Sequence, residues 1–420
     1  MTKKQKNILF IVIDCLGADF VYKEGKTYIP TIKKLKDNGY SFLNTIASTT
    51  TTTPSFASLL TGLYPFQSGV RSHSGYSLKN DVKTIPEILK ENGYNTYAEV
   101  TGPLTKEIGL SKGFDEYNFR SEKETIHKKF GYDLIKKFDK YYKSPWFVLL
   151  HIWSLHEPRI VIKECKSKKY GETLYGRALA SIDKYLEKLV NKIDENTLII
   201  ITGDHGEQIC YSIFDRFWKK ARSFIFKILK KCGIKKVHFA KGIRKFHIGH
   251  GYSVYDVLIR VPLIFYNKDI VPNGKSSEQI RHIDIFPTIL NILDIKYPKD
   301  IEGESLVPLM NGKTIQSKDA YMEAVGIIIP NKDEWLAGLR VNNKYKYIYS
   351  PFRQDFEEEL YDLENDPTEK QNIAQKNKDL IALFRKKIEE MKTEKLTGEK
   401  LTEEDQKRIR ERLKDLGYMD

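Results

Sequence analysis

Cysteine is scarce in this sequence. Only four cysteines occur among 420 residues, and none forms a CxxC pair with another: Cys15, Cys165, Cys210 and Cys232. Four widely spaced thiols are too few for a disulfide framework, and their spacing does not fit a cysteine zinc site. We therefore expect reduced thiols.

Long apolar runs are also missing. The longest run near the N-terminus, Ile8 to Ile13, has six residues and ends at Asp14. It is too short for a signal-peptide core or a membrane span, and no later run approaches ~18 apolar residues. The sequence therefore predicts a cytoplasmic protein.

Acidic residues are fewer than basic residues, and the difference is concentrated in one segment of the chain. The chain has 70 Lys and Arg against 56 Asp and Glu, a net charge of +14. Between residues 208 and 249 there are twelve basic residues and one acidic residue, Asp215. Because the rest of the chain is nearly neutral, the basic balance describes one local surface, and we predict no nucleic-acid partner.

The apolar residues predict an α/β fold. Asn7 to Asp14 is an almost continuous β-branched and apolar run, which is typical of a strand buried on both faces of a parallel sheet. Similar runs alternate with stretches of helical spacing. The other predicted strands are 96–100, 146–151, 197–202 and 261–266, and the predicted helices are 29–38, 84–92 and 175–193. We expect a mostly parallel central sheet flanked by helices.

The pattern changes after about Lys318. Segments 321–329, 339–349 and 360–363 are short and alternating, which predicts a small antiparallel sheet. From Gln375 the chain is charged and helical, with one apolar stripe made of Leu380, Leu383, Phe384, Ile388 and Met391. We predict a catalytic domain at 1–317, with an insertion at 208–249, and a small C-terminal α+β subdomain at 318–420 that ends in charged helices.

Acidic side chains follow two of the predicted strands. Asp14 ends the first strand, and Asp204 and His205 follow the strand at 197–202. In parallel sheets, ligands bind at the carboxyl ends of strands. Asp14 could cap a helix or bind a cation, and the Asp-His pair could form a hydrogen-bonded turn or bind a metal.

A third candidate is Thr52, in the segment TTPSFASLLTG. Hydroxyl residues followed by proline and an apolar run place Thr52 at the start of a helix, where backbone N–H groups attract an anion. The alternative is an ordinary helix cap.

With Thr52 the sequence resembles the sulfatase branch of the alkaline phosphatase superfamily, whose signature is Cys or Ser followed by x-P-S-R-x-x-x-L-T-G. The resemblance extends in order along nearly the whole chain. Its further segments are NILFIVIDCLGAD, LTGLYP, IGLSKGFDEYNF, HIWSLHEP, GDHGE, HGYSVY, HIDIFPT, ELYDL and a final LGY. The resemblance implies an alkaline phosphatase-like fold and a metal held by Asp14, Asp204 and His205, with Thr52 facing it.

Two positions depart from that signature. Family members convert Cys or Ser at the nucleophile position into formylglycine, but oxidation of Thr52 would stop at a ketone. The arginine after Pro-Ser is Phe56 here. Because relatives in the superfamily that act on phosphate esters use an unmodified threonine, we predict a phosphoester hydrolase or transferase with a phosphothreonine intermediate. The alternatives are a sulfatase with an atypical nucleophile and an inactive member that binds polyanions or membranes.

The predicted site is rich in oxygen ligands and has one histidine ligand, which suits Zn, Mn, Mg or Ca. The metal would activate the Thr52 hydroxyl. His156 and His250 would bind the nonbridging oxygens and protonate the leaving group. A second metal lacks an obvious carboxylate, because Ser154 stands where relatives often have Asp. His73 is a weaker candidate for lining the pocket.

The segment 208–249 separates two of these motifs and contains aromatic and aliphatic residues at helical spacing beside its lysines. This pattern predicts a basic amphipathic helix. It could pack on the protein, grip an anionic substrate as a lid, or contact an anionic membrane. An anionic, lipid-linked phosphoester substrate at the inner membrane surface would combine the last two interpretations.

Overall fold

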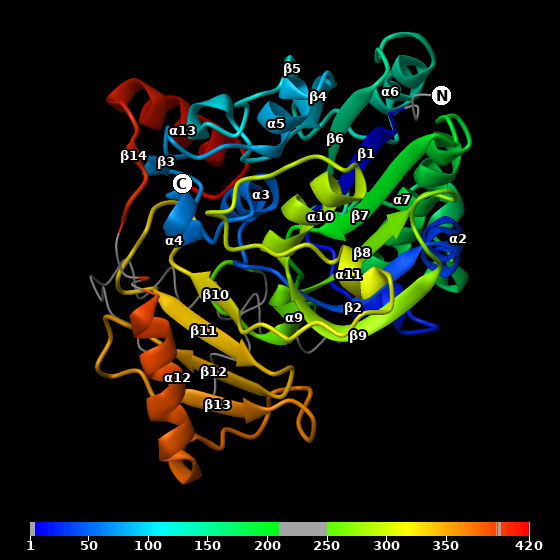
Figure 1. Cartoon of the computed structure of the whole chain (residues 1–420). Coiled ribbons are helices and arrows are strands. Elements are labelled where there is room, and N and C mark those ends of the chain that lie inside the picture. The colour runs from blue at the N-terminus through cyan, green and yellow to red at the C-terminus, as the bar shows by residue number, and fades with distance from the viewer. Residues whose placement is uncertain (1–4, 210–249, 392, 394–395, 420) are drawn as a thin grey trace.

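A central sheet of eight strands organises the computed structural model, which describes residues 5–209, 250–391, 393 and 396–419 (Figure 1). The strand order is β5-β4-β6-β1-β7-β8-β2-β9. The five strands from β5 to β7 are parallel, and β8 runs antiparallel to both of its neighbours. The prediction of a mostly parallel sheet flanked by helices is confirmed.

The strands of this sheet are β1 (Asn7–Ile13), β2 (Tyr40–Ile46), β4 (Asn95–Val100), β5 (Glu116–Phe119), β6 (Trp146–Ile152), β7 (Thr197–Gly203), β8 (Arg260–Tyr266) and β9 (Gly274–Arg281). One face is covered by α2 (Pro30–Asn38), α6 (Lys129–Lys140) and α7 (Leu174–Val190). The other face is covered by α3 (Thr52–Thr61), α5 (Ile85–Glu91), α10 (Ile285–Ile292) and α13 (Glu403–Asp415).

Strand β1 lies in the middle of the sheet and is buried on both faces. Phe10 and Val12 point into the core beneath α3, whereas Leu9 and Ile11 point into the core beneath α7. All four side chains are completely buried. The continuous apolar run in the sequence therefore reflects a strand between two helical layers.

A second, smaller sheet lies beside the first (Figure 1). It is antiparallel, with the order β10 (Ala320–Ala324), β11 (Leu336–Val341), β12 (Tyr345–Tyr349) and β13 (Glu359–Asp362), and α12 (Lys378–Glu390) packs on it. The predicted small antiparallel sheet is thus confirmed. The domain boundary at residues 317 and 318 stays a prediction.

Several details differ from the sequence predictions. The polar strands β2 and β9 were not predicted, because Asn44 and Ser276 interrupt their apolar alternation and their pairing has register shifts. In α12, Leu383 is 48% exposed, and Ile381 occupies the buried stripe instead. Apart from Gln208 and Ile209, the predicted basic amphipathic helix lies outside the described residues. Among the helices of the described residues, none is both long and apolar enough to cross a membrane.

Candidate active site

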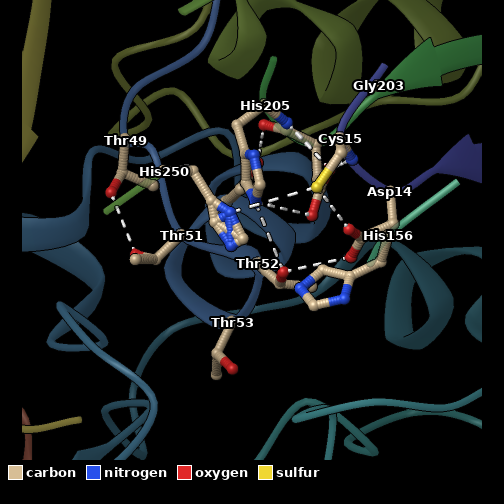
Figure 2. Close-up of polar contacts among 12 residues, drawn as sticks. Asp14, Cys15, Thr49, Thr51, Thr52, Thr53, His156, Gly203, His205 and His250 are labelled. Atoms are coloured by element: carbon tan, nitrogen blue, oxygen red, sulfur yellow. Dashed lines mark hydrogen bonds and ion pairs between the residues drawn. The ribbon is translucent and has the colours of Figure 1, made fainter. Parts of the chain in front are cut away.

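Three elements bring the predicted site residues together. Asp14 follows β1, Asp204 and His205 follow β7, and Thr52 begins α3. Ile13 pairs in register with Gly203, so the segments that leave these parallel strands are neighbours. Figure 2 shows Asp14, Thr52 and His205 pointing toward one another. The four side chains are all completely buried.

Thr52 occupies the first residue of α3, after Thr51 in an extended conformation. Its hydroxyl donates to Asp14 Oδ2 at 3.2 Å and lies 3.4 Å from His205 Nε2 (Figure 2). His205 Nδ1 lies 2.8 Å from the carbonyl oxygen of Gly206, so Nδ1 carries the proton. Nε2 therefore presents its lone pair to the Thr52 hydroxyl or to a cation.

Asp204 is anchored through one oxygen. Its Oδ1 accepts backbone N–H groups from Cys15 at 3.0 Å and from His205 at 2.8 Å. Its Oδ2 is buried without a hydrogen-bond partner among the described residues, and His205 Nε2 lies 3.4 Å away. An unpaired carboxylate oxygen inside a protein is costly, so Oδ2 has a free ligand position for a cation.

The pKa values of Asp14 and Asp204 are shifted in opposite directions. Burial, followed by the charge of Asp14, raises the pKa of Asp204 to about 6 against the opposing effect of His205. Burial also disfavours ionised Asp14, but a hydrogen bond with His151 and the charges of His156 and His205 outweigh it and hold its pKa well below the usual range. A divalent cation would relieve the repulsion between the carboxylates.

The donor atoms fit such a cation. Ligand atoms of Asp14, His151 and Asp204 lie within 4.8 Å of one another, as do those of the sets Asp14–Cys15–His156 and Cys15–His205–His250. Carboxylate oxygens and imidazole nitrogens are ligands of hard and borderline divalent ions. The residues present are therefore suited to hold a divalent metal.

The two predicted catalytic histidines belong to the same cluster. His250 packs beside His205, with ring centroids 4.3 Å apart, and His156 lies 5.4 Å from His250 by the same measure. Burial lowers the pKa of His250 well below its usual value, and the charges of His205 and His156 act in the same direction. The structure thus brings all six predicted residues into one cluster, and their individual roles stay predictions.

Two further residues of the cluster were not predicted. His151, at the end of β6, has Nε2 3.3 Å from Asp14 Oδ2 and Nδ1 3.2 Å from the carbonyl oxygen of Thr101. Its place at a strand end beside β1 was the signal that could have identified it. Cys15 has a positive φ of 60°, and its thiol donates to Asp14 Oδ1 at 2.8 Å. Burial and the charge of Asp14 raise the pKa of this thiol, so it stays protonated.

The positions that depart from the family signature are apolar or neutral. Phe56 is buried one turn after Thr52 and packs edge-on against His151, with ring centroids 4.9 Å apart. Ser154 is also buried. His73 lies beside the first turn of α3, where its Nδ1 is 2.8 Å from the hydroxyl of Thr53.

Comparison with protein families gives two matches. The family described as Sulfatase matches residues 6–295, and N-sulphoglucosamine sulphohydrolase, C-terminal, matches residues 251–394. An ulvan-active sulfatase of Formosa agariphila is 23% identical over 92% of this chain and 79% of its own length. An N-acetylgalactosamine-6-O-sulfatase of Bacteroides thetaiotaomicron is 22% identical over 93% of this chain and 94% of its own length.

Solved structures agree on the fold. The crystal structure of Ps i-CgsB in complex with k-i-k-neocarrahexaose has a TM-score of 0.69 at 19% identity and covers 97% of this chain and 98% of its own. A structure in complex with its substrate D-glucosamine-2-N,6-O-disulfate has a TM-score of 0.67 at 18% identity, covering 93% and 99%.

These relatives overturn two predictions. The expected action on phosphate esters, as hydrolase or transferase, is wrong, because the similar proteins are named for the sulfate esters that they cleave. The predicted partners were a phosphoester substrate, possible lipid linkage of that substrate, and contact with an anionic membrane. These predictions are wrong for the same reason, since the names of the relatives give sulfated sugars as their substrates. An unmodified threonine does not decide between the two esters, because one position cannot distinguish a tetrahedral sulfate from a phosphate.

Proposed function

Because the chain belongs to the sulfatase family, we propose that it is a metal-dependent hydrolase of sulfate esters in which unmodified Thr52 supplies the nucleophile. The position of the Thr52 hydroxyl carries this proposal. It is buried at the start of α3, 3.2 Å from a carboxylate oxygen of Asp14 and 3.4 Å from Nε2 of His205.

Asp14, Asp204 and His205 would hold the metal. A divalent ion held there would neutralise sulfate oxygens and lower the pKa of the neighbouring Thr52 hydroxyl. The proposal names the metal only as a divalent ion, Zn, Mn, Mg or Ca, since the ligand set suits all four. Asp14 orients Thr52 by accepting the hydroxyl hydrogen.

The reaction would proceed in two displacements. Thr52 Oγ1 attacks sulfur and gives its proton to the neutral ring of His250, the bond between sulfur and the ester oxygen breaks, and His250 passes that proton to the departing alcohol. Water then attacks the sulfur of the sulfothreonine, releasing sulfate and restoring the Thr52 hydroxyl. The sum is one ester and one water converted to one alcohol and one hydrogen sulfate.

The names of the relatives suggest the substrate class. They include sulfatases of ulvan, of N-acetylgalactosamine 6-sulfate and of hexuronate 2-sulfate. We propose a sulfated sugar as the substrate of this chain. Its charged sulfate would enter toward the buried carboxylates only with the metal in place, which makes the metal a requirement for binding.

The test compares nitrophenyl sulfate, N-acetylgalactosamine 6-sulfate and nitrophenyl phosphate with the same purified, metal-loaded protein. We expect turnover of a sulfate ester that exceeds phosphate turnover and disappears after treatment with a chelator. Preference for phosphate would overturn the proposal. Binding of sulfate without any turnover would also overturn it, and would identify an inactive polyanion-binding member in which Phe56 replaces the usual arginine.

A further inference from the structure

The C-terminal end of the chain reaches the candidate active site. Helix α13 packs through Ile409 and Leu413 into the core beneath the large sheet. Arg412 fixes its last turn, because its Nε donates to the carbonyl oxygen of Gly102 at 3.1 Å and its guanidinium lies 2.8 Å from Glu122. The helix therefore ends beside the loop that follows β4 (Figure 1).

A tight turn then directs the chain toward the site. The N–H of Gly417 donates to the carbonyl oxygen of Lys414, and the N–H of Tyr418 donates to that of Leu413, both at 2.9 Å. This pair of bonds is a Schellman motif, which requires a left-handed residue after the helix. Gly417 has φ +79°, and a Cβ built on it would meet no atom within 4 Å. Only the backbone conformation therefore demands glycine here.

Tyr418 meets two histidines of the site. Its hydroxyl lies 3.3 Å from Nε2 of His156, and its ring centroid lies 5.2 Å from that of His73. The ring also packs against the core beneath the sheet. Burial raises the pKa of the phenol, and the charges of Asp14, Cys15 and Asp204 add to the effect, so the phenol keeps its proton.

His156 is held from its other sides as well. It stacks on Trp153, with ring centroids 4.0 Å apart and planes at 21°. Its Nδ1 lies 2.7 Å from the carbonyl oxygen of Glu157, which can only accept a hydrogen bond. Nδ1 therefore carries the proton, and in the neutral ring Nε2 accepts the hydrogen bond that Tyr418 donates.

We propose that Tyr418 is a positioning residue that fixes the ring of His156 and forms the side wall of the pocket next to the leaving alcohol. This inference rests on the proposed function, because it requires that the oxygen of the departing alcohol lies next to His156. The hydroxyl of Tyr418 holds Nε2 in place, and the phenol ring, together with His73, limits the size of the group that can lie beside His156.

The first test does not depend on activity. In protein labelled with ¹⁵N-histidine, the ring nitrogens of His156 are assigned by comparison with His156→Gln. We expect protonated Nδ1 and hydrogen-bonded Nε2 in the wild type, and a shift of the Nε2 signal in Tyr418→Phe but not in Lys414→Ala. An unchanged His156 signal in Tyr418→Phe would overturn the proposal.

The second test uses the kinetics of two sulfate esters, nitrophenyl sulfate and the bulkier methylumbelliferyl sulfate. We expect Tyr418→Phe to lower kcat about 10-fold with little change in KM, since a His156 ring that is no longer fixed would orient the departing group less well and slow the chemical step. Tyr418→Ala should shift the preference toward the bulkier ester by about 10-fold. Gly417→Ala should resemble Tyr418→Ala, and Lys414→Ala should resemble the wild type.

Equal losses on both esters in every variant would show that the turn only stabilises the fold, which would overturn the side-wall assignment. If the wild type cleaves neither ester, the proposed function fails, and the ¹⁵N measurement still decides whether Tyr418 holds His156. The two failures are therefore distinguishable.

Discussion

At the scale of single residues, the proposed function depends on the hydroxyl oxygen of Thr52. Its contacts with Asp14 and His205 place it where a nucleophile would face the metal site. Threonine cannot give the aldehyde that members of the family form at this position. If the unmodified hydroxyl acts, the reaction depends on the oxygen itself and tolerates loss of the methyl group.

We therefore expect Thr52→Ala to reduce kcat on a sulfate ester by roughly three orders of magnitude, because removal of a nucleophile removes a whole step. Thr52→Ser should keep a measurable part of the activity. Thr61→Ala, at the other end of the same helix, serves as the folding control, since Thr61 is buried but bonds only within its own turn. Full activity of Thr52→Ala would show that water attacks the ester directly.

The second prediction at this scale concerns Asp204. Its Oδ2 has no hydrogen-bond partner among the described residues, so this carboxylate is the ligand that a bound cation would stabilise most. We expect about one divalent ion per chain in the wild type and loss of that ion in Asp204→Asn, because an amide oxygen carries no charge. Plasma emission spectrometry measures the content, and Asp37→Asn, on the surface of α2, should keep the metal.

At the scale of elements, α2 is joined to α7 through a buried carboxylate. Asp183 on α7 accepts the N–H groups of Thr31 at 3.0 Å and Ile32 at 2.8 Å, in the first turn of α2. Burial raises the pKa of Asp183 to about 6, above about 3.9 in an unfolded chain, although the two N–H groups oppose the shift. The folded chain therefore favours protonated Asp183.

A raised pKa gives this group a stabilising contribution that is complete below about pH 4 and is lost as the pH rises through about 6. Relative to Asp183→Asn, the wild type should lose about 2 kcal/mol of unfolding free energy between pH 4 and pH 7, from a pKa that is about two units higher in the folded chain. Urea unfolding of both proteins at the two pH values measures the difference. An equal response of the two proteins to pH would contradict the assignment.

At the scale of the whole molecule, a buried charge cluster joins the two sheets. Lys346 on β12 is completely buried and lies 3.0 Å from Asp256 and 2.7 Å from Glu369. Asp256 begins α9 (Asp256–Ile259), directly before β8 of the large sheet, and also lies 3.1 Å from Arg340. The small sheet is therefore held to the large one by ion pairs as well as by apolar packing.

We expect Lys346→Met to lower the free energy of unfolding by about 3–5 kcal/mol, because two buried carboxylates lose a shared cation. Lys344→Met is the matched control. Its ammonium pairs with Glu364 where both side chains are largely exposed, so its removal should cost less than about 1 kcal/mol. Equal effects in urea unfolding would show that the cluster contributes no more than a surface ion pair.

The sequence predicted the strands β1, β4, β6, β7 and β8 of the large sheet, and its resemblance to a known family named six site residues that the structure brings into one cluster. Apolar runs such as Asn7–Ile13 reveal buried strands, because a strand covered on both faces has no polar positions. Residues that follow such strands meet at one edge, so Asp14, Asp204 and His205 can be grouped from their positions along the chain. Strands β2 and β9 could not be found, because their polar residues hide the period of the sheet.

Only the tertiary structure decided which other side chains complete the site. His151, Cys15 and Tyr418 lie far from one another in the sequence, and they reach the site because the ends of β1, β6 and α13 converge there. The substrate class was beyond both the local pattern and the geometry, since sulfate and phosphate have the same shape and the same oxygen donors. Comparison of the whole chain with its relatives favours sulfate. The similarity extends over hundreds of residues, whereas the prediction of phosphate depended mainly on the single position Thr52.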